Sequence, residues 1–192
     1  MDPKLRCGWC EKDDLYRTYH DTEWGRPVRD DRTMFEFLLL ETFQAGLSWY
    51  TVLAKREHFR VAFDHFDYEK ISQYDEAKIH ELMQNAGLIR NALKIRAAVT
   101  NAQAYQRVRN EFGTFCNYLW GFTNHQPIDN APATLRDIPA ATPLADTISK
   151  DLKKRGFTFV GPTVVYAHLQ ATGIVNDHLQ DCWTRKEGGG EV

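Results

Sequence analysis

The longest nearly unbroken apolar stretch of the chain runs from Phe35 to Leu53 and reads FEFLLLETFQAGLSWYTVL. Helical spacing places Glu41, in its middle, on one stripe with four apolar neighbours, Met34, Phe37, Leu38 and Ala45. Such a stripe is typical of a helix that faces a core, where a glutamate is rarely found without a partner. Two interpretations follow: Glu41 turns to solvent at a helix end, or it lines a pocket beside Trp49.

The same pattern predicts the other elements. It breaks at Gly46, and Leu47-Ser48-Trp49 indicates a short turn with a cap for a second helix, while Asp31 is the predicted N-cap of the first. Further helices are predicted over residues 51–57, 58–63, 68–73, 75–85, 90–109, 110–121, 144–155 and 161–172. Residues 124–143, which hold four of the seven prolines, are predicted to form one long loop. Because no convincing strand is found, the predicted fold class is all-α.

The first thirty residues have poor periodicity and an unusual density of aromatic and sulfur side chains. This segment contains Cys7, Trp9, Cys10, Tyr16, Tyr19, His20 and Trp24. Its glycines and acidic pairs indicate a loop with short helical turns. A surface loop would not normally carry so many aromatic rings, so we expect the segment to pack over another part of the molecule.

Composition limits the class of protein. With 192 residues, 43% hydrophobic and 26% charged, the chain is expected to form one domain or two packed lobes over residues 1–187, followed by a disordered tail at 188–192. The net charge of −2 means that a nucleic-acid partner would need a local basic face. No apolar segment is long enough to span a bilayer, and no signal peptide is evident, so we expect a cytoplasmic protein with reduced cysteines.

One possible metal site joins the two ends of the chain. His178 and Cys182 are spaced i,i+4, so one helical turn could direct both at a single ion. The N-terminal segment offers Cys7 with either His20 or Cys10, and both sets would close a tetrahedral structural zinc site. The alternatives are a chance spacing with Cys182 as a buried apolar residue, or a redox motif at Cys7–Cys10, which lacks the βαβ context that such motifs require.

A second constellation spans Lys153 to Thr163, KKRGFTFVGPT. This stretch has a helix-hairpin-helix pattern: a basic helix end, a turn bounded by glycines, and a new helix with proline at its first position. The turn and the start of the new helix suit a phosphate. Lys150 adds to its local positive face. The alternative is an ordinary helical hairpin whose cations neutralise a helix C-terminus. The DNA-binding candidates are Lys153, Lys154, Arg155, Gly156, Gly161 and Thr163.

Five motifs occur in one order along the chain: RCGW at 6–9, YHDTEWG at 19–25, QAGLSW at 44–49, KKRGFTFVG at 153–161 and NDH at 176–178. Together they closely resemble the 3-methyladenine DNA glycosylase I family, and the likeness extends from Cys7 to Cys182. The resemblance implies an all-helical fold of the helix-hairpin-helix glycosylase type, with a zinc site that joins the N- and C-terminal segments. It also implies hydrolysis of the N-glycosidic bond of 3-methyladenine in DNA.

The resemblance implies roles for individual residues. The family's zinc ligands fall on Cys7, His20, His178 and Cys182, which leaves Cys10 as a neighbouring thiol that could compete with His20. Its base-pocket residues fall on Glu41, Tyr19 and Trp49, with Trp9, Tyr16 and Trp24 as pocket wall or packing. Glu41 is also the leading catalytic candidate, because no carboxylate follows the hairpin before Asp177. Thr42 stands where we expect a smaller residue.

The implied chemistry is simple hydrolysis. Methylation at N3 puts positive charge on adenine and weakens its glycosidic bond, so the enzyme can rely on positioning the flipped base. No lysine stands in the pocket motifs, so no Schiff base is expected. The expected partner is double-stranded DNA with alkylated adenine, and no protein partner is implied, so we expect a monomer. Two rivals are a non-catalytic sensor of alkylated or abasic DNA and a zinc- or thiol-dependent metabolic protein that uses Cys7 and Cys10.

Overall fold

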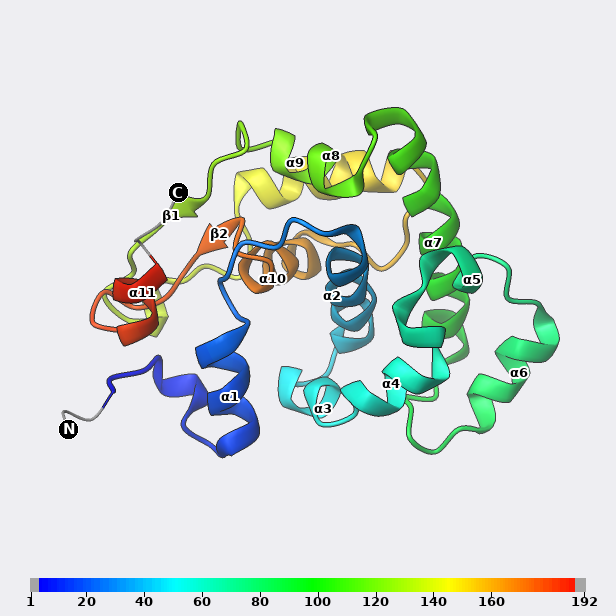
Figure 1. Cartoon of the computed structure of the whole chain (residues 1–192), viewed down its shortest axis with the longest axis horizontal. Helices are drawn as coiled ribbons and strands as arrows, with labels where there is room; N and C mark the ends of the chain where they lie inside the picture. Colours follow the sequence, from blue (N-terminus) through cyan, green and yellow to red (C-terminus); the bar gives the residue numbers. More distant parts are fainter. Residues whose placement is uncertain (1–3, 189–192) are drawn as a thin grey trace.

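The computed structural model describes residues 4–188, and these fold almost entirely into helices (Figure 1). The α-helices are α1 (Asp14–Thr22), α2 (Asp31–Gln44), α3 (Trp49–Leu53), α4 (Arg56–Ala62), α5 (Tyr68–Ile71), α6 (Glu76–Gln84), α7 (Ala92–Phe112), α8 (Phe115–Gly121), α9 (Pro143–Lys154), α10 (Pro162–Ala171) and α11 (Trp183–Gly188). Short 3-10 turns are η1 (Gly8–Cys10), η2 (Asp64–Phe66) and η3 (Leu135–Asp137), and the strands are β1 (Ile128–Asp129) and β2 (Val175–Asn176). The all-α prediction is confirmed.

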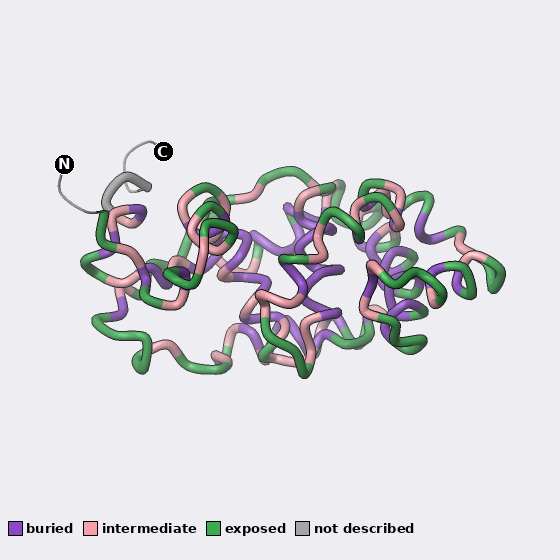
Figure 2. The backbone as a smooth tube through the Cα atoms, turned by 90° about the horizontal axis from the view of Figure 1, so that it is seen from below, coloured by how far each residue is buried: buried purple, intermediate pink, exposed green. Residues whose placement is uncertain are grey.

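Helix α2 lies at the centre of the molecule, next to α10 and α7 (Figure 1). Every residue from Met34 to Phe43 is buried, and the buried part of the chain runs through the middle of the molecule in Figure 2. A helix that is apolar on all sides is stable only when other elements surround it. The first part of the long apolar run, up to Gln44, therefore forms the central helix rather than an amphipathic surface helix.

The start of α2 corrects one prediction. Its N-cap is Asp30, whose carboxylate accepts a hydrogen bond from the backbone N–H of Thr33. Asp31, the predicted cap, is instead the first residue of the helix. Its carboxylate accepts the backbone N–H groups of Phe115 and Cys116 at the start of α8, at 3.2 and 3.0 Å. Asp31 therefore fastens α8 to α2, a contact that local sequence does not reveal.

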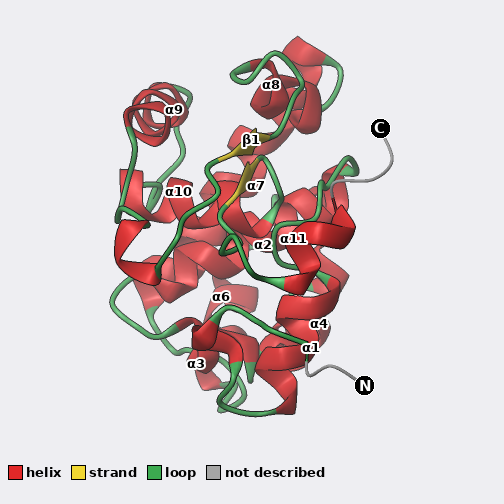
Figure 3. Cartoon of the chain, turned by 90° about the vertical axis from the view of Figure 1, so that its left-hand side faces the viewer, coloured by secondary structure: helices red, strands yellow, loops and turns green. Residues whose placement is uncertain are grey.

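Other boundaries differ because tertiary contacts decide them. Residues 110–112 extend α7 instead of opening the next helix, since Gly113 ends α7 and Thr114 caps α8. Helices α3 and α4 begin earlier than predicted, and Ser48 caps α3 as expected. Two very short strands lie within this helical fold: β1 and β2 pair in parallel, Ile128 with Val175 (Figure 3). Each strand has only two residues and its partner is distant in sequence, so no local pattern signals it.

The first and last described segments lie together at one side of the molecule (Figure 1). The backbone N–H of Trp183 donates to the carbonyl of Leu5 at 2.9 Å. Of the predicted tail, Gly188 ends α11, and residues 189–192 lie outside the described part of the chain. The division into two lobes stays a prediction. None of the helices between residues 4 and 188 has the length and apolar character needed to cross a membrane.

Candidate active site and metal centre

A cavity of about 340 Å³ lies between α1, α2, α3 and the C-terminal half of α10. All six residues that the resemblance assigned to a base pocket line it, although they come from separate segments of the chain. The full lining consists of Trp9, Tyr16, Tyr19, Trp24, Glu41, Gln44, Trp49, Leu135, Ile138, Ala167 and Gln170. The interpretation of Glu41 as a pocket residue is therefore confirmed, and the solvent-facing alternative is wrong.

Among the residues that line this cavity, Glu41 is the one with an acidic side chain, and it is only 3% exposed. Its Oε2 atom has no hydrogen-bond partner among residues 4–188. Burial raises the pKa of this carboxyl to about 8, because a carboxylate loses its hydration there without gaining a compensating charge. A buried, unpartnered polar atom at a cavity wall is available to a ligand that offers hydrogen-bond donors or positive charge.

Aromatic rings form the remaining walls. Tyr19 and Trp49 pack against one another in a tilted arrangement, with a centroid distance of 5.4 Å and an angle of 45°. Trp9 packs edge-on against Tyr16 and Trp24, with centroids 5.3 and 5.1 Å away. The indole Nε1 of Trp49 is buried and has no partner within the described chain. These walls suit a flat, electron-poor ring, which can stack on aromatic faces and accept a hydrogen bond from the indole.

Several lining residues escaped sequence reasoning. Gln44 stands in a recognised motif but was given no role, while Ala167 and Gln170 follow the hairpin on α10. Leu135 and Ile138 belong to the segment that was predicted only as a long loop. Nothing in the local pattern places that loop over the cavity. Its position depends on contacts with the C-terminal segment, including a hydrogen bond from Asn130 to Asp177.

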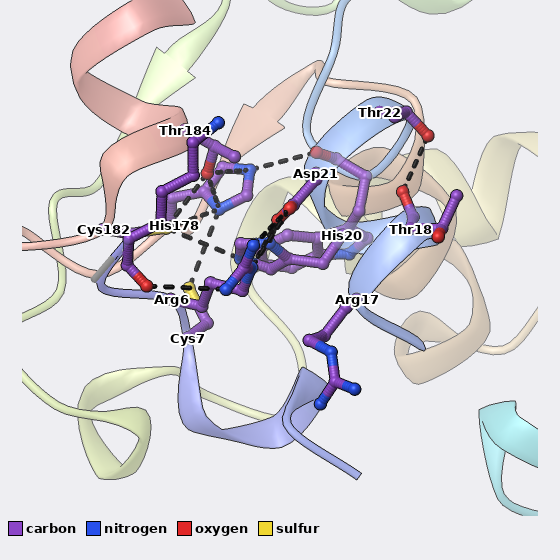
Figure 4. A network of polar contacts seen from close by, with 12 residues as sticks. Arg6, Cys7, Arg17, Thr18, His20, Asp21, Thr22, His178, Cys182 and Thr184 are labelled. Carbon is purple, nitrogen blue, oxygen red and sulfur yellow. Dashed lines mark hydrogen bonds and ion pairs between the residues drawn. The ribbon is translucent and has the colours of Figure 1, made fainter. Parts of the chain in front are cut away.

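Four buried side chains from the two ends of the chain meet beside the cavity: Cys7, His20, His178 and Cys182. Their nearest ligand atoms all lie within 4.8 Å of one another, and the side chains point toward one another in Figure 4. The sulfur of Cys182 is 3.5 Å from Nε2 of His20 and 3.6 Å from Nδ1 of His178. Cys10 is buried but lies outside this group, so the set with His20 is the one assembled.

The opposite nitrogen of each imidazole has an acceptor. Nδ1 of His20 lies 2.8 Å from the carboxylate of Asp21, which Arg6 also contacts at 2.8 Å. Nε2 of His178 lies 3.0 Å from the carbonyl oxygen of Trp24. These contacts fix the tautomers, so that Nε2 of His20 and Nδ1 of His178 present lone pairs to the cluster. Metal-binding histidines commonly have this arrangement.

The donor set fits a metal ion. Hydrogen bonding to Cys182 and burial raise the pKa of the Cys7 thiol, whereas hydrogen bonds with Cys7 and both imidazoles lower the pKa of Cys182. For a tetrahedral zinc ion with usual bond lengths, a sulfur–nitrogen edge is about 3.5 Å. The observed sulfur–nitrogen separations of 3.5 and 3.6 Å match this value. Thr184, which sequence reasoning did not identify, lies with its hydroxyl 3.0 Å from the sulfur of Cys182.

The cluster and the cavity share two walls. The indole of Trp9 packs edge-on against His20, with centroids 5.4 Å apart, and Trp24 packs edge-on against His178 at 4.6 Å. Both tryptophans also line the cavity. The Cys/His cluster therefore packs against the aromatic wall on one side.

The helix-hairpin-helix element consists of α9, α10 and the turn between them. Pro162 is the first residue of α10, as predicted, and Phe159 occupies the turn with a positive φ of 56°. Lys153 and Lys154 are exposed and form no ion pair within the described chain. Arg155 differs from them, because its guanidinium binds Asp151 and Glu111 at 2.6 and 2.7 Å. Gly156 lies in the same turn, Gly161 is the N-cap of α10, and Thr163 lies in the first turn of that helix.

The helical fold, the helix-hairpin-helix pattern and the aromatic cavity with its buried carboxyl are the features expected of a helical DNA glycosylase. A family model described as methyladenine glycosylase matches residues 9–186. The chain belongs to this family, whose enzymes are hydrolases.

Curated relatives agree with the family model. The chain is 48% identical to DNA-3-methyladenine glycosylase 1 of Escherichia coli K12, over 92% of this chain and 95% of that protein. It is 47% identical to DNA-3-methyladenine glycosylase of Haemophilus influenzae, over 92% and 96%.

Solved structures give the same result. A crystal structure of 3-methyladenine DNA glycosylase I superposes with a TM-score of 0.91 at 45% identity, covering 93% of this chain and 98% of that one. The Staphylococcus aureus enzyme, whose structure addresses recognition of 3-methyladenine, has a TM-score of 0.90 at 37% identity, covering 93% and 95%. The resemblance predicted from the motifs is confirmed.

Proposed function

We propose that this chain removes 3-methyladenine from alkylated double-stranded DNA by hydrolysing the N-glycosidic bond, leaving an abasic site. The observation that carries the proposal is the unpartnered carboxyl of Glu41 in an aromatic cavity. The family and the names of the relatives support the substrate. DNA that contains the lesion is accordingly the partner.

The flipped base is held between aromatic walls in this proposal. Tyr19 and Trp49 contact the base, and cation–π attraction favours an alkylated base over a neutral one. Trp9, Tyr16 and Trp24 complete the wall. Flipping costs less for a damaged base than for a paired one, so the enzyme gains selectivity before the base reaches the cavity.

Glu41 recognises the base and assists bond cleavage. Its carboxylate accepts hydrogen bonds from the base and stabilises positive charge on the lesion and on the sugar as the bond breaks. Since burial raises the pKa of Glu41 to about 8 in the empty cavity, a cationic ligand that binds there also favours loss of its proton. The cavity lining contains no lysine, so water rather than an amine attacks the sugar.

The metal is zinc with a structural role. Cys7, His20, His178 and Cys182 would supply all four ligands and leave no position for a substrate or a water molecule. When bound, the ion ties the two ends of the chain beside the cavity. Lys153, Lys154, Gly156, Gly161 and Thr163 are the proposed phosphate contacts. Arg155, the sixth candidate, is held by Asp151 and Glu111 and is assigned a structural role.

The proposal is tested by measuring release of free 3-methyladenine from methylated duplex DNA. Wild type is expected to release the base, and Glu41→Gln to lose about 100-fold in rate. The matched control is Glu81→Gln, an exposed glutamate on α6 away from the cavity. Equal release by Glu41→Gln would keep the glycosylase and overturn the role of Glu41. Binding without any release by folded, metal-loaded wild type would favour a non-catalytic damage sensor.

A further inference from the structure

Lys94, in the first turn of α7, is a buried lysine outside the cavity. Lys94 is only 6% exposed. Its Nζ donates to the carbonyl oxygens of Phe43 and Ala45 at 2.8 and 2.6 Å. No carboxylate within residues 4–188 forms an ion pair with it. An ammonium group is costly to bury, so these two hydrogen bonds must compensate for much of its lost hydration.

The two carbonyls stand on either side of a helix end. Helix α2 ends at Gln44, and Phe43 is in its last turn, where carbonyl groups lack intrahelical partners. Ala45 is the C-cap, with a ψ of 114° that takes the chain out of the helix. One ammonium group therefore binds the last turn and the first residue beyond it. The negative end of the helix dipole adds to this attraction.

This helix end leads directly into the cavity wall. Gln44 lines the cavity at the end of α2, and Trp49 lines it at the start of α3. Helix α3 has only five residues, and its cap hydrogen bond from Thr51 to Ser48 is 3.3 Å long. So short a helix cannot hold Trp49 by itself. The conformation of residues 45–48 decides where the indole lies relative to Glu41.

We propose that Lys94 is a positioning residue for base recognition. By fixing the end of α2 against α7, it holds the turn over residues 45–48 in the shape that places Gln44 and Trp49 around the base. This inference rests on the proposed function, because it assumes that the cavity binds the excised base. Lys94 itself does not line the cavity, so it acts through these two residues.

Lys55 offers a matched control. Its Nζ donates to the carbonyl oxygens of Ala86 and Gly87 at 3.3 and 3.1 Å, which is the same kind of bridge between a lysine and two backbone carbonyls. Those carbonyls belong to the connection between α6 and α7, and no residue of that connection lines the cavity. A merely structural lysine bridge should behave as Lys55 does.

The experiment compares wild type with Lys94→Met, Lys94→Arg and Lys55→Met, all as full-length metal-loaded protein. Binding of free 3-methyladenine is followed by tryptophan fluorescence, and base release from methylated duplex DNA by single-turnover kinetics. Urea unfolding defines conditions in which every variant is folded. Lys94→Met is expected to lose about 10- to 100-fold in base affinity and release rate, because small misplacements of binding groups have effects of this size.

The other variants separate positioning from stability. Lys55→Met should bind and release the base as wild type does, and Lys94→Arg should recover much of the loss because it restores a charged donor. If Lys94→Met does not fold, the same measurements are made on Lys94→Gln, which keeps an N–H donor and should show a smaller loss. Wild-type values for the folded Lys94 variants would overturn the inference. A wild type that neither binds nor releases the base would instead overturn the proposed function.

Discussion

Glu36 and Glu41 lie on the same helix, and both are buried, but only Glu36 has cationic partners. The carboxylate of Glu36 binds Arg56 and Arg60, each at 2.7 Å. Oε2 of Glu41 has no partner in the described chain. A buried carboxyl that has a cationic partner can stay charged, whereas a buried carboxyl without a partner favours its neutral form. The chain thus keeps one carboxyl for structure and leaves the other available to a ligand.

Glu41→Gln should change how stability depends on pH. Burial raises the pKa of Glu41 in the folded protein to about 8 from its ordinary value of 4.5. The neutral form of Glu41 contributes to stability. This contribution is fully present at pH values below the pKa of Glu41 in the unfolded chain, and it is lost as the pH rises through about 8. Glutamine does not titrate, so Glu41→Gln should gain stability relative to wild type between pH 5 and 9.

Thermal unfolding across this range measures the effect. Each pKa unit corresponds to about 1.4 kcal/mol, so the gain should reach a few kcal/mol at pH 9. Glu81→Gln, on an exposed surface, is the control and should follow wild type. Parallel stability curves for Glu41→Gln and wild type would show that Glu41 is hydrated or paired in solution.

The same carboxyl should give base release a distinct pH profile. The carboxylate form attracts the cationic lesion, so kcat/KM on methylated DNA should rise with pH and level off above about 8, the pKa of Glu41 in the free enzyme. Glu41→Gln should release the base more slowly, and its kcat/KM should not rise with pH in this way. The profile is measured by steady-state base release at constant ionic strength. An unchanged rise in the variant would assign the titration to another group.

Lysine and arginine at the hairpin should differ in their effect on DNA binding. Lys153→Ala and Lys154→Ala should each weaken binding and reduce the slope of log affinity against log salt by about 1, since each removes a phosphate contact. Arg155→Ala should leave the slope unchanged and lower stability instead. Its guanidinium binds Asp151 and Glu111 and lies over the Phe112 ring, 4.9 Å from the centroid.

Fluorescence anisotropy with a DNA duplex at several salt concentrations measures these slopes. Lys150→Ala is a useful comparison, because Lys150 already pairs with Asp146 at 2.6 Å. A loss of one unit of slope in Arg155→Ala would show that Arg155 leaves its carboxylate partners to bind DNA.

Removal of the metal should loosen the chain ends without exposing the central core. Elemental analysis should find one zinc ion per chain, and a strong chelator should lower the melting temperature. Cys7 and Cys182 should then react with a thiol reagent, while Cys116, which is buried between α8 and its neighbours, should stay protected. Unchanged thiol reactivity after chelation would count against a metal at this site.

How far the sequence predicted the structure depends on the range of the interactions involved. Ser48 was identified correctly as a helix cap because capping is local. His178 and Cys182 were correctly paired as members of one cluster, but the predicted helical turn was wrong, because residues 178–182 form a non-helical turn before α11. Asp31 was misassigned because its partners lie on α8, more than eighty residues away. Leu135 was missed because contacts with the C-terminal segment place its loop over the cavity. The five motifs together predicted the residues of the site, whereas hydrophobic periodicity alone did not decide whether Glu41 lines a pocket or turns to solvent.

Gly25 links the backbone to the metal centre, and its substitution gives a further prediction. Its φ of 77° is disfavoured for residues with a side chain, and an added Cβ would lie 2.8 Å from Nε2 of His178. Gly25→Ala should therefore strain the backbone and push the His178 ring away from the other ligands. Gly113→Ala is the matched control, because φ is 81° there and the nearest atom, on Asn117, is 3.9 Å away.

Both alanine variants should lose about 1 to 2 kcal/mol of stability from the left-handed conformation. Only Gly25→Ala should also bind zinc more weakly, as measured by competition with a chelator, because His178 can no longer hold Nδ1 in the cluster while Nε2 donates to Trp24. Equal zinc affinity in the two variants would show that the His178 ring can move aside and still bind. In that case Gly25 would serve the turn after α1 and not the metal centre.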